Sequence, residues 1–176
     1  MGSDAIIISL KKYGLDDIKR LGIAVSKCLF PGAKVLLLGD LGTGKTTLTS
    51  YIINGLSDKP INVTSPTFSL IKVYDTNPRV YHIDLYRLTD PQEIEYLEIF
   101  TDSDGVYIIE WANFLDYLTP EERLEIHISY NENIRYRDLY IKSFGEKYEE
   151  LKSKIEKELY SSVDSAHTKR NFRKGL

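Results

Sequence analysis

The segment GDLGTGKTT, residues 39–47, constrains the fold of this chain more than any other stretch. A glycine, four residues and then Gly-Lys-Thr form the Walker A pattern, in which backbone N–H groups turn inward around phosphate oxygens. The apolar run KVLLL, residues 34–38, precedes it, and residues 46–56 carry apolar side chains at helical spacing. A strand that leads through such a loop into a helix predicts a phosphate-binding unit of the P-loop type.

The residue types in the loop indicate which groups would contact a nucleotide. Lys45 can reach the β- and γ-phosphates, and the hydroxyl of Thr46 can ligate Mg²⁺. The predicted nucleotide-binding residues are Asp40, Leu41, Gly42, Thr43, Gly44, Lys45, Thr46 and Thr47. The alternative is a glycine-rich turn that binds nothing, and the strand before it and the helix after it disfavour that interpretation.

The rest of the chain predicts a mixed sheet. Two hairpins are expected, one with strands 68–74 and 80–86 and the other around residues 131–133, and a hairpin makes neighbouring strands antiparallel. Further strands are expected at 5–9 and 106–111, and helices at 15–30, 90–100 and 146–159. The predicted fold is α/β: a P-loop NTPase-like three-layer sandwich whose mixed sheet contains antiparallel hairpin strands.

Length and composition favour one domain. The 176 residues suffice for a substantial core, so we expect a P-loop ATPase domain at 1–145. Residues 146–176 would add a helix and a frayed basic tail, not a separate domain. A net charge of −3 argues weakly against a dedicated nucleic-acid-binding domain. Short apolar runs, no signal-peptide pattern and a single cysteine, Cys28, predict a cytoplasmic protein without membrane contact or internal disulfide.

Two acids are candidates for catalysis. Asp84 ends the run VYHID, and Glu110 ends VYIIE. If both strands run parallel to the strand before the loop, their carboxyl ends meet beside the phosphates. Either acid could act on Mg²⁺ while the other polarises the attacking water, and the sequence does not divide these roles. The alternative is that each is a structural carboxylate that caps a helix or pairs with a cation.

The segment SPTF, residues 65–68, lies where P-loop proteins often carry a switch that senses the γ-phosphate. Thr67 could therefore supply a hydroxyl to Mg²⁺ or to water, although the segment taken alone is better explained as a proline turn that enters a strand. His82 and His127 are expected to be ordinary strand residues, and Trp111 is expected to pack.

Four motifs stand in order along the chain: GDLGTGKTT, SPTF, HIDLYRL and IIEW. Together they resemble the TsaE family, also called YjeE, over about residues 15–144. The resemblance implies that Lys45 and Thr46 are the phosphate lysine and the Mg²⁺ ligand, Glu110 a second Mg²⁺-associated acid, Asp84 an essential acid and Thr67 the switch threonine. Arg135 aligns more loosely, with a segment near the base.

The same resemblance implies a function. The chain would bind and hydrolyse ATP with Mg²⁺, slowly alone and faster with a partner, in the N6-threonylcarbamoyladenosine (t6A37) modification of tRNA. It would act on the TsaD–TsaB heterodimer to support multiple turnover, and its contact with tRNA would be indirect, through that complex.

Other functions remain open on the sequence alone. The main alternative is a P-loop small-molecule kinase, which usually needs an arginine-rich lid, and the chain has no such segment. A nucleotide-binding module without hydrolysis would not need both acids. A GTPase is disfavoured because no N-K-x-D motif is present.

Overall fold

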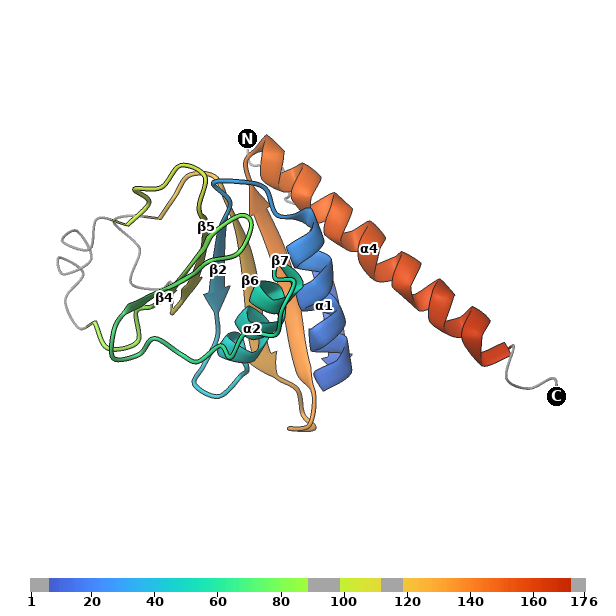
Figure 1. Ribbon diagram of the computed structural model, residues 1–176. Helices are drawn as coiled ribbons and strands as arrows, with labels where there is room; N and C mark the ends of the chain where they lie inside the picture. Colours follow the sequence, from blue (N-terminus) through green and yellow to red (C-terminus); the bar gives the residue numbers. More distant parts are fainter. Residues whose placement is uncertain (1–6, 89–98, 112–118, 172–176) are drawn as a thin grey trace, which may run out of the picture.

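The computed structural model describes residues 7–88, 99–111 and 119–171. Within these residues the chain forms a seven-stranded sheet in the order β1-β7-β6-β2-β5-β4-β3, flanked by three helices (Figure 1). The strands are β1 (Ile8–Tyr13), β2 (Lys34–Leu38), β3 (Ile71–Tyr74), β4 (Val80–Asp84), β5 (Val106–Glu110), β6 (Arg123–Tyr130) and β7 (Arg137–Phe144). The helices are α1 (Leu15–Cys28), α2 (Lys45–Gly55) and α4 (Glu146–Asn171).

The sheet is mixed, as predicted. Strands β4, β5, β2 and β6 are parallel to their neighbours in this central group. The two predicted hairpins pair β3 with β4 and β6 with β7 in antiparallel fashion, and β1 pairs antiparallel with β7. Because β4 and β5 run parallel to β2, the condition set for Asp84 and Glu110 is met: both carboxylates lie at the same end of the sheet as the loop after β2.

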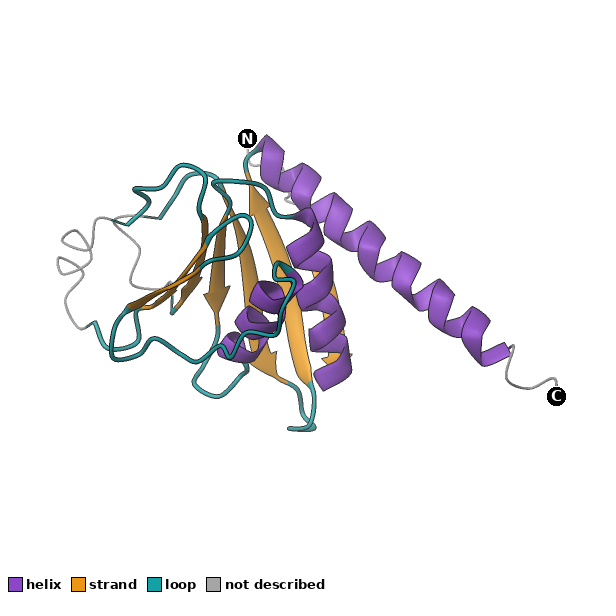
Figure 2. Ribbon diagram, viewed as in Figure 1, coloured by secondary structure: helices purple, strands orange, loops and turns teal. Residues whose placement is uncertain are grey.

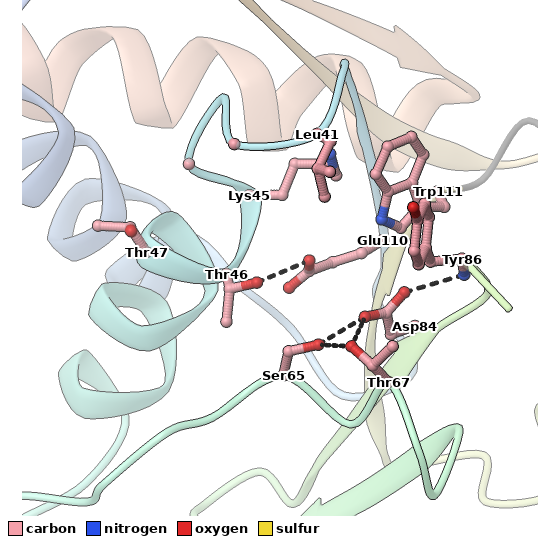
Figure 3. Close-up of a pocket in the computed structure, with 12 residues that line it drawn as sticks. Leu41, Lys45, Thr46, Thr47, Ser65, Thr67, Asp84, Tyr86, Glu110 and Trp111 are labelled. Atoms are coloured by element: carbon pink, nitrogen blue, oxygen red, sulfur yellow. Dashed lines mark hydrogen bonds between the residues drawn. The ribbon is translucent and has the colours of Figure 1, made fainter. Parts of the chain in front are cut away.

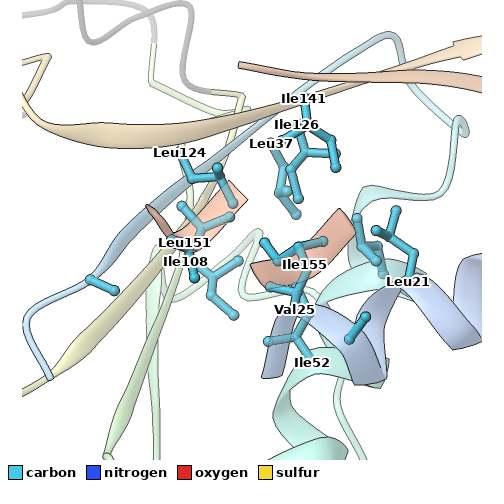
Figure 4. Packing of buried hydrophobic residues seen from close by; sticks show 14 of the residues in the cluster. Leu21, Val25, Leu37, Ile52, Ile108, Leu124, Ile126, Ile141, Leu151 and Ile155 are labelled. Atoms are coloured by element: carbon cyan, nitrogen blue, oxygen red, sulfur yellow. The ribbon is translucent and has the colours of Figure 1, made fainter. Parts of the chain in front are cut away.

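One face of the sheet is covered by α1, α2 and α4 (Figure 2). Figure 4 shows how side chains from the sheet and all three helices meet in a single apolar cluster. Each helix contributes residues of one face, among them Leu21 and Val25 of α1, Leu48 and Ile52 of α2, and Leu151 and Ile155 of α4. The helical periodicity seen in the sequence therefore marks the sides that pack on the sheet.

The opposite face of the sheet carries a second apolar cluster around Leu36, Ile83, Tyr107 and Ile109. The α/β class and the mixed sheet are confirmed. The helix that the sequence predicts at 90–100 falls mostly outside the described residues.

Several predicted boundaries are wrong: β3 begins at Ile71, not at 68, β4 ends at Asp84, not at 86, and the first strand and the last helix differ more. The first strand spans Ile8–Tyr13, not 5–9, and it is an edge strand that pairs only with β7. An edge strand can include polar residues such as Lys11 and Lys12, because part of it faces solvent. The apolar run therefore does not mark where β1 begins and ends. The last helix continues to Asn171, beyond the predicted end at residue 159 and through the predicted frayed tail. No glycine or proline interrupts residues 146–171, so nothing in the sequence forces the helix to end earlier.

Candidate nucleotide-binding site

The loop between β2 and α2 has the backbone conformation that its glycines allow. Gly39, Gly42 and Gly44 have φ angles of 150°, 77° and 108°, in the region that favours glycine. A Cβ atom on Gly39 would lie 2.2 Å from the carbonyl oxygen of Ile128, so no other residue fits there without movement. A Cβ atom on Gly44 would meet nothing within 4 Å, because this glycine faces an open pocket.

Five consecutive carbonyl oxygens of this loop, those of residues 39–43, accept hydrogen bonds from side chains. The Lys45 ammonium donates to the first two, at 2.7 and 2.9 Å. The Tyr130 hydroxyl donates to the third at 2.9 Å, and the Arg137 guanidinium donates to the last two, at 3.4 and 2.8 Å. Tyr130 and Arg137 come from the β6–β7 hairpin, so this hairpin fixes the orientation of the loop's peptide groups.

The loop borders a pocket of about 370 Å³ (Figure 3). It is lined by Leu41, Gly42, Gly44, Lys45, Thr46, Thr47, Ser65, Thr67, Asp84, Tyr86, Glu110 and Trp111. Six of the eight predicted loop residues line it. Thr43 is instead buried beneath the loop, where its hydroxyl donates to the Asp40 carbonyl at 2.9 Å, and the Asp40 side chain is exposed. The pocket therefore brings the Walker A residues together with both candidate acids and the predicted switch residue.

Glu110 lies at the centre of one hydrogen-bond group. The Thr46 hydroxyl donates to Glu110 Oε2 at 2.9 Å, and Thr49 lies 3.2 Å from Oε1. The imidazole Nε2 of His82 is 2.7 Å from the same Oε1. Glu110 and His82 are both buried, with 2% and 0% of their side chains exposed. The two predicted Mg²⁺ ligands, Thr46 and Glu110, are thus in direct contact.

Asp84 organises a second group beside the first. Its Oδ2 accepts hydrogen bonds from Ser65 at 2.6 Å and from Thr67 at 2.9 Å, and its Oδ1 accepts one from the Tyr86 backbone N–H at 2.9 Å (Figure 3). The hydroxyls of Ser65 and Thr67 also bond to each other. Asp84 and Glu110 occupy paired positions on β4 and β5, so the two groups are neighbours. Asp84 therefore ties the predicted switch segment to the end of the sheet.

The electrostatics of the loop favour an anion. α1 has two acidic residues in its first turn, Asp16 and Asp17, whereas the first turn of α2 has none. The first turn of α2 therefore adds no negative charge of its own to the positive end of the helix dipole, and the carboxylate bonded there is Glu110 of β5. Burial lowers the pKa of Lys45, and the carboxylates of Glu110, Asp84 and Asp40 oppose this shift. The Lys45 ammonium also lies 3.7 Å from the centre of the Trp111 ring.

Arg135 lies in a second, smaller pocket on the other side of the loop. This pocket, of about 180 Å³, is lined by Tyr13, Gly14, Leu15, Ile18, Gly42, Thr43, Gly44, Thr47, Arg135 and Arg137. It shares Gly42, Gly44 and Thr47 with the first pocket, so the two adjoin around the helix start. A molecule with phosphates in the first pocket could extend a flat ring toward the second.

Several contributors to the site are not among the predicted site residues, among them His82, Tyr130, Arg137 and Ser65. His82 was expected to be an ordinary strand residue, but it contacts Glu110, and a shared face with Asp84 at alternate positions of β4 is the signal that could have revealed it. Arg137, which donates to two carbonyls of the loop, lies two positions after the predicted Arg135. Ser65 was included only within its segment, yet it makes the shorter bond to Asp84. Trp111 packs on Tyr86, with ring centres 4.9 Å apart, as expected of a packing residue.

The donors present suit Mg²⁺. A hydroxyl and a carboxylate in contact, with a second carboxylate on the next strand, are hard oxygen ligands, and Mg²⁺ usually takes only one or two protein ligands and keeps several waters. Among residues 7–88, 99–111 and 119–171, no cluster of three or more histidine, cysteine or acidic side chains forms a denser metal site. In the same residues, no helix is sufficiently long and apolar to cross a membrane.

A glycine-rich loop between a central parallel strand and a helix, with carboxylates at the ends of the adjoining strands, defines a P-loop protein of the α/β class. Residues 14–139 match the model of the family described as "Threonylcarbamoyl adenosine biosynthesis protein TsaE". The chain belongs to the TsaE family. The matched region includes both pockets' loop residues and ends before α4.

Named relatives agree with this assignment. The chain is 39% identical over 108 residues to the tRNA threonylcarbamoyladenosine biosynthesis protein TsaE of Haemophilus influenzae, an alignment covering 60% of this chain and 68% of the relative. It is 38% identical over 135 residues to the protein of the same name from Bacillus subtilis, covering 76% and 82%. The crystal structure of Bacillus subtilis YdiB superimposes with a TM-score of 0.71 at 27% identity, over 89% of this chain and 98% of that one.

Proposed function

We propose that this chain is a Mg²⁺-dependent ATPase that acts in the threonylcarbamoyladenosine modification of tRNA. Its membership of the TsaE family supports the pathway. The observation that carries the proposed chemistry is the pocket in which Lys45, Thr46, Glu110, Asp84 and Thr67 converge at the carboxyl ends of parallel strands. The same P-loop arrangement supports ATP hydrolysis in many other proteins.

The nucleotide would lie across both pockets. Backbone N–H groups of residues 42–47 and the Lys45 ammonium would hold the phosphates, because they lie at the positive start of α2, whose first turn has no acidic residue. The nucleoside would extend toward the second pocket, where Leu15 offers apolar contact and Arg135 a planar cation. For Lys45, phosphate contact would replace its present bonds to the carbonyls of residues 39 and 40.

Thr46 and Glu110 would hold Mg²⁺, Thr46 directly and Glu110 directly or through water. When bound, Mg²⁺ neutralises negative charge that develops on the phosphates during transfer. The present Thr46–Glu110 bond of 2.9 Å means that both oxygens already face the same point, so little movement is needed to bring them to a shared ion. Their placement on α2 and β5, two rigid elements, favours a defined site.

Asp84 would orient and deprotonate the attacking water, with Thr67 as the switch. The Asp84 carboxylate is buried and bonded to hydroxyls of residues 65 and 67, so it can exchange a hydroxyl partner for a water without being exposed to bulk solvent. Release of Thr67 from Asp84 would then free its hydroxyl for the metal or the γ-phosphate. A segment that must be reordered for catalysis gives a slow ATPase, which a partner surface can accelerate.

The partner we propose is the TsaD–TsaB heterodimer, with tRNA contacted indirectly through that complex in the cytoplasm. ATP turnover would reset the heterodimer between catalytic cycles, so that it modifies more than one tRNA. If the ATP-bound form binds the partner more tightly, then by linkage the partner must tighten ATP binding by the same factor.

A reconstituted reaction tests this proposal. It contains TsaD–TsaB, tRNA, threonine, bicarbonate, ATP and the enzyme that makes threonylcarbamoyl-adenylate. With the full chain, modified tRNA should exceed one equivalent of TsaD–TsaB, and with the Lys45→Ala variant it should stop near one equivalent. Equal multiple turnover without the chain would refute the proposed role. Transfer of phosphate to an added small-molecule acceptor would favour the kinase alternative instead.

A further inference from the structure

We propose that His82 is a positioning residue, which holds the Glu110 carboxylate in the orientation required for Mg²⁺ binding. This inference rests on the proposed function, because it assumes that Glu110 serves the metal. His82 lies in the middle of β4, two residues before Asp84, with none of its side chain exposed. Alternation along β4 and β5 directs His82, Asp84 and Glu110 to the face of the sheet that α2 covers.

The contact divides the two oxygens of Glu110 between different partners. A carboxylate oxygen only accepts hydrogen bonds, so His82 Nε2 carries the proton that it donates to Oε1 at 2.7 Å. The other oxygen, Oε2, faces the Thr46 hydroxyl at 2.9 Å. The Thr49 hydroxyl makes a weaker hydrogen bond to Oε1. The Thr49 oxygen lies 3.2 Å from Oε1, and its single proton is shared with the Lys45 carbonyl oxygen at 3.0 Å. The main hydrogen bond that fixes Oε1 therefore comes from His82, and Oε2 faces the pocket.

The second ring nitrogen of His82 makes this arrangement costly. Nδ1 is buried and has no hydrogen-bond partner in the described part of the chain. Most buried polar atoms are paired, and one that is not destabilises the fold. An apolar side chain of similar size would avoid this cost at a wholly buried strand position. The gain that offsets it is the bond to Glu110, which only the Nε2 side of the ring makes.

The ring itself is held in place by its neighbours. The Tyr74 ring of β3 stacks on it, with centres 6.3 Å apart and planes inclined by 30°. A fixed ring gives a fixed donor, and hydrogen bonds from outer residues orient metal-binding carboxylates in this way. Thr46 can turn toward an ion as it binds, whereas the Oε1 contact lies behind the carboxylate and can persist. His82 therefore acts on Glu110 and touches neither nucleotide nor metal.

The test measures metal affinity directly. Mn²⁺ is titrated into the protein–ADP complex and free Mn²⁺ is followed by electron paramagnetic resonance, for the parent, His82→Leu and His82→Gln. Loss of an outer partner typically weakens metal binding about 10-fold to 100-fold, which is the change expected for His82→Leu. Glutamine places an amide N–H near the position of Nε2, so His82→Gln should remain close to the parent. ADP affinity without divalent metal should be the same in all three.

A matched control comes from the other described histidine–glutamate pair. His127 Nε2 lies 3.0 Å from Glu125 on β6, in neither pocket, so His127→Leu should leave Mn²⁺ affinity unchanged. His82→Asn, whose amide is too short to reach Glu110, should match His82→Leu and replaces it if the leucine variant does not fold. Parent-like Mn²⁺ affinity in the leucine or asparagine variant would overturn the proposal, as would an equal loss in His82→Gln. Because the readout is metal affinity, the outcome does not depend on any effect on tRNA modification.

Discussion

The substitution Asp84→Asn should remove ATP hydrolysis while leaving the fold and nucleotide binding almost intact. Asparagine has the same shape as aspartate, and its oxygen can still accept the Tyr86 N–H. Its amide would face the hydroxyls of Ser65 and Thr67, which can rotate to accept in place of donating. The variant therefore changes charge and proton affinity at one buried atom rather than packing.

The expected magnitudes follow from these three bonds. Hydrogen bonds to a charged group contribute about 1 kcal/mol more than neutral ones, which gives at most about 3 kcal/mol for the set. The neutral asparagine avoids the desolvation cost of a buried carboxylate, which offsets part of this loss. The free energy of unfolding should therefore fall by about 1–2 kcal/mol. Loss of a residue that accepts a proton from the attacking water typically slows the chemical step about 10²-fold to 10⁴-fold, or about 3–5 kcal/mol in the activation barrier.

Two assays separate these effects: calorimetric ATP affinity and single-turnover phosphate release, with urea unfolding to measure stability. Asp102→Asn is the matched control, because Asp102 also accepts a hydroxyl, from Tyr81 at 2.9 Å, and a backbone N–H at 3.0 Å, but lies before the amino end of β5. It should hydrolyse ATP as the parent does. Parent-like phosphate release by Asp84→Asn would refute the reasoning and leave Asp84 as a structural carboxylate.

Three further predictions concern the loop and the last helix. Lys45→Ala should abolish tight ATP binding in calorimetry. In the parent, ATP affinity should decline as pH rises through the Lys45 pKa, because the ammonium that binds phosphate is then lost. Burial lowers this pKa, so the decline should begin at a lower pH than for an ordinary lysine. Gly39→Ala should lower the free energy of unfolding, measured by urea denaturation, by about 2–4 kcal/mol, because its Cβ would clash with the Ile128 carbonyl. Gly44→Ala introduces backbone strain without a clash, so it should lower the free energy of unfolding by only about 1–2 kcal/mol. Ile155→Ala should cost about 3 kcal/mol and keep a single unfolding transition, because α4 shares the main core; two separate transitions would contradict this.

The central part of the fold and site was predictable because its signals are local. The loop pattern, the apolar run before it and the helical spacing after it together locate β2 and α2 to within one residue. The meeting of Asp84 and Glu110 followed from a general property of parallel strands, whose carboxyl ends share an edge. The catalytic, metal and nucleotide roles of these residues, Thr67 and Arg135 stay predictions.

What the sequence did not reveal depends on contacts between distant segments. The alternation of side chains along a strand predicts that His82 and Asp84 lie on the same face of β4. The contact between His82 and Glu110 also depends on the register between β4 and β5, which the sequence does not reveal. In the same way, the reach of Arg137 to the loop depends on how the β6–β7 hairpin lies against β2. The length of α4 is not evident from composition, because its last residues are polar and basic as in a frayed tail, although residues 146–171 contain no glycine or proline.

The tethering of the loop carbonyls has a consequence for the entropy of binding. Fixing one residue's backbone costs roughly 1–2 kcal/mol, so ordering five loop residues costs roughly 5–10 kcal/mol, and the bonds from Tyr130 and Arg137 place much of this cost in folding rather than in association. When Lys45 turns to a phosphate, only the first two carbonyls lose its ammonium, and the others stay bonded to the hairpin. A nucleotide thus meets a loop already shaped for it by a residue 94 positions further along the chain.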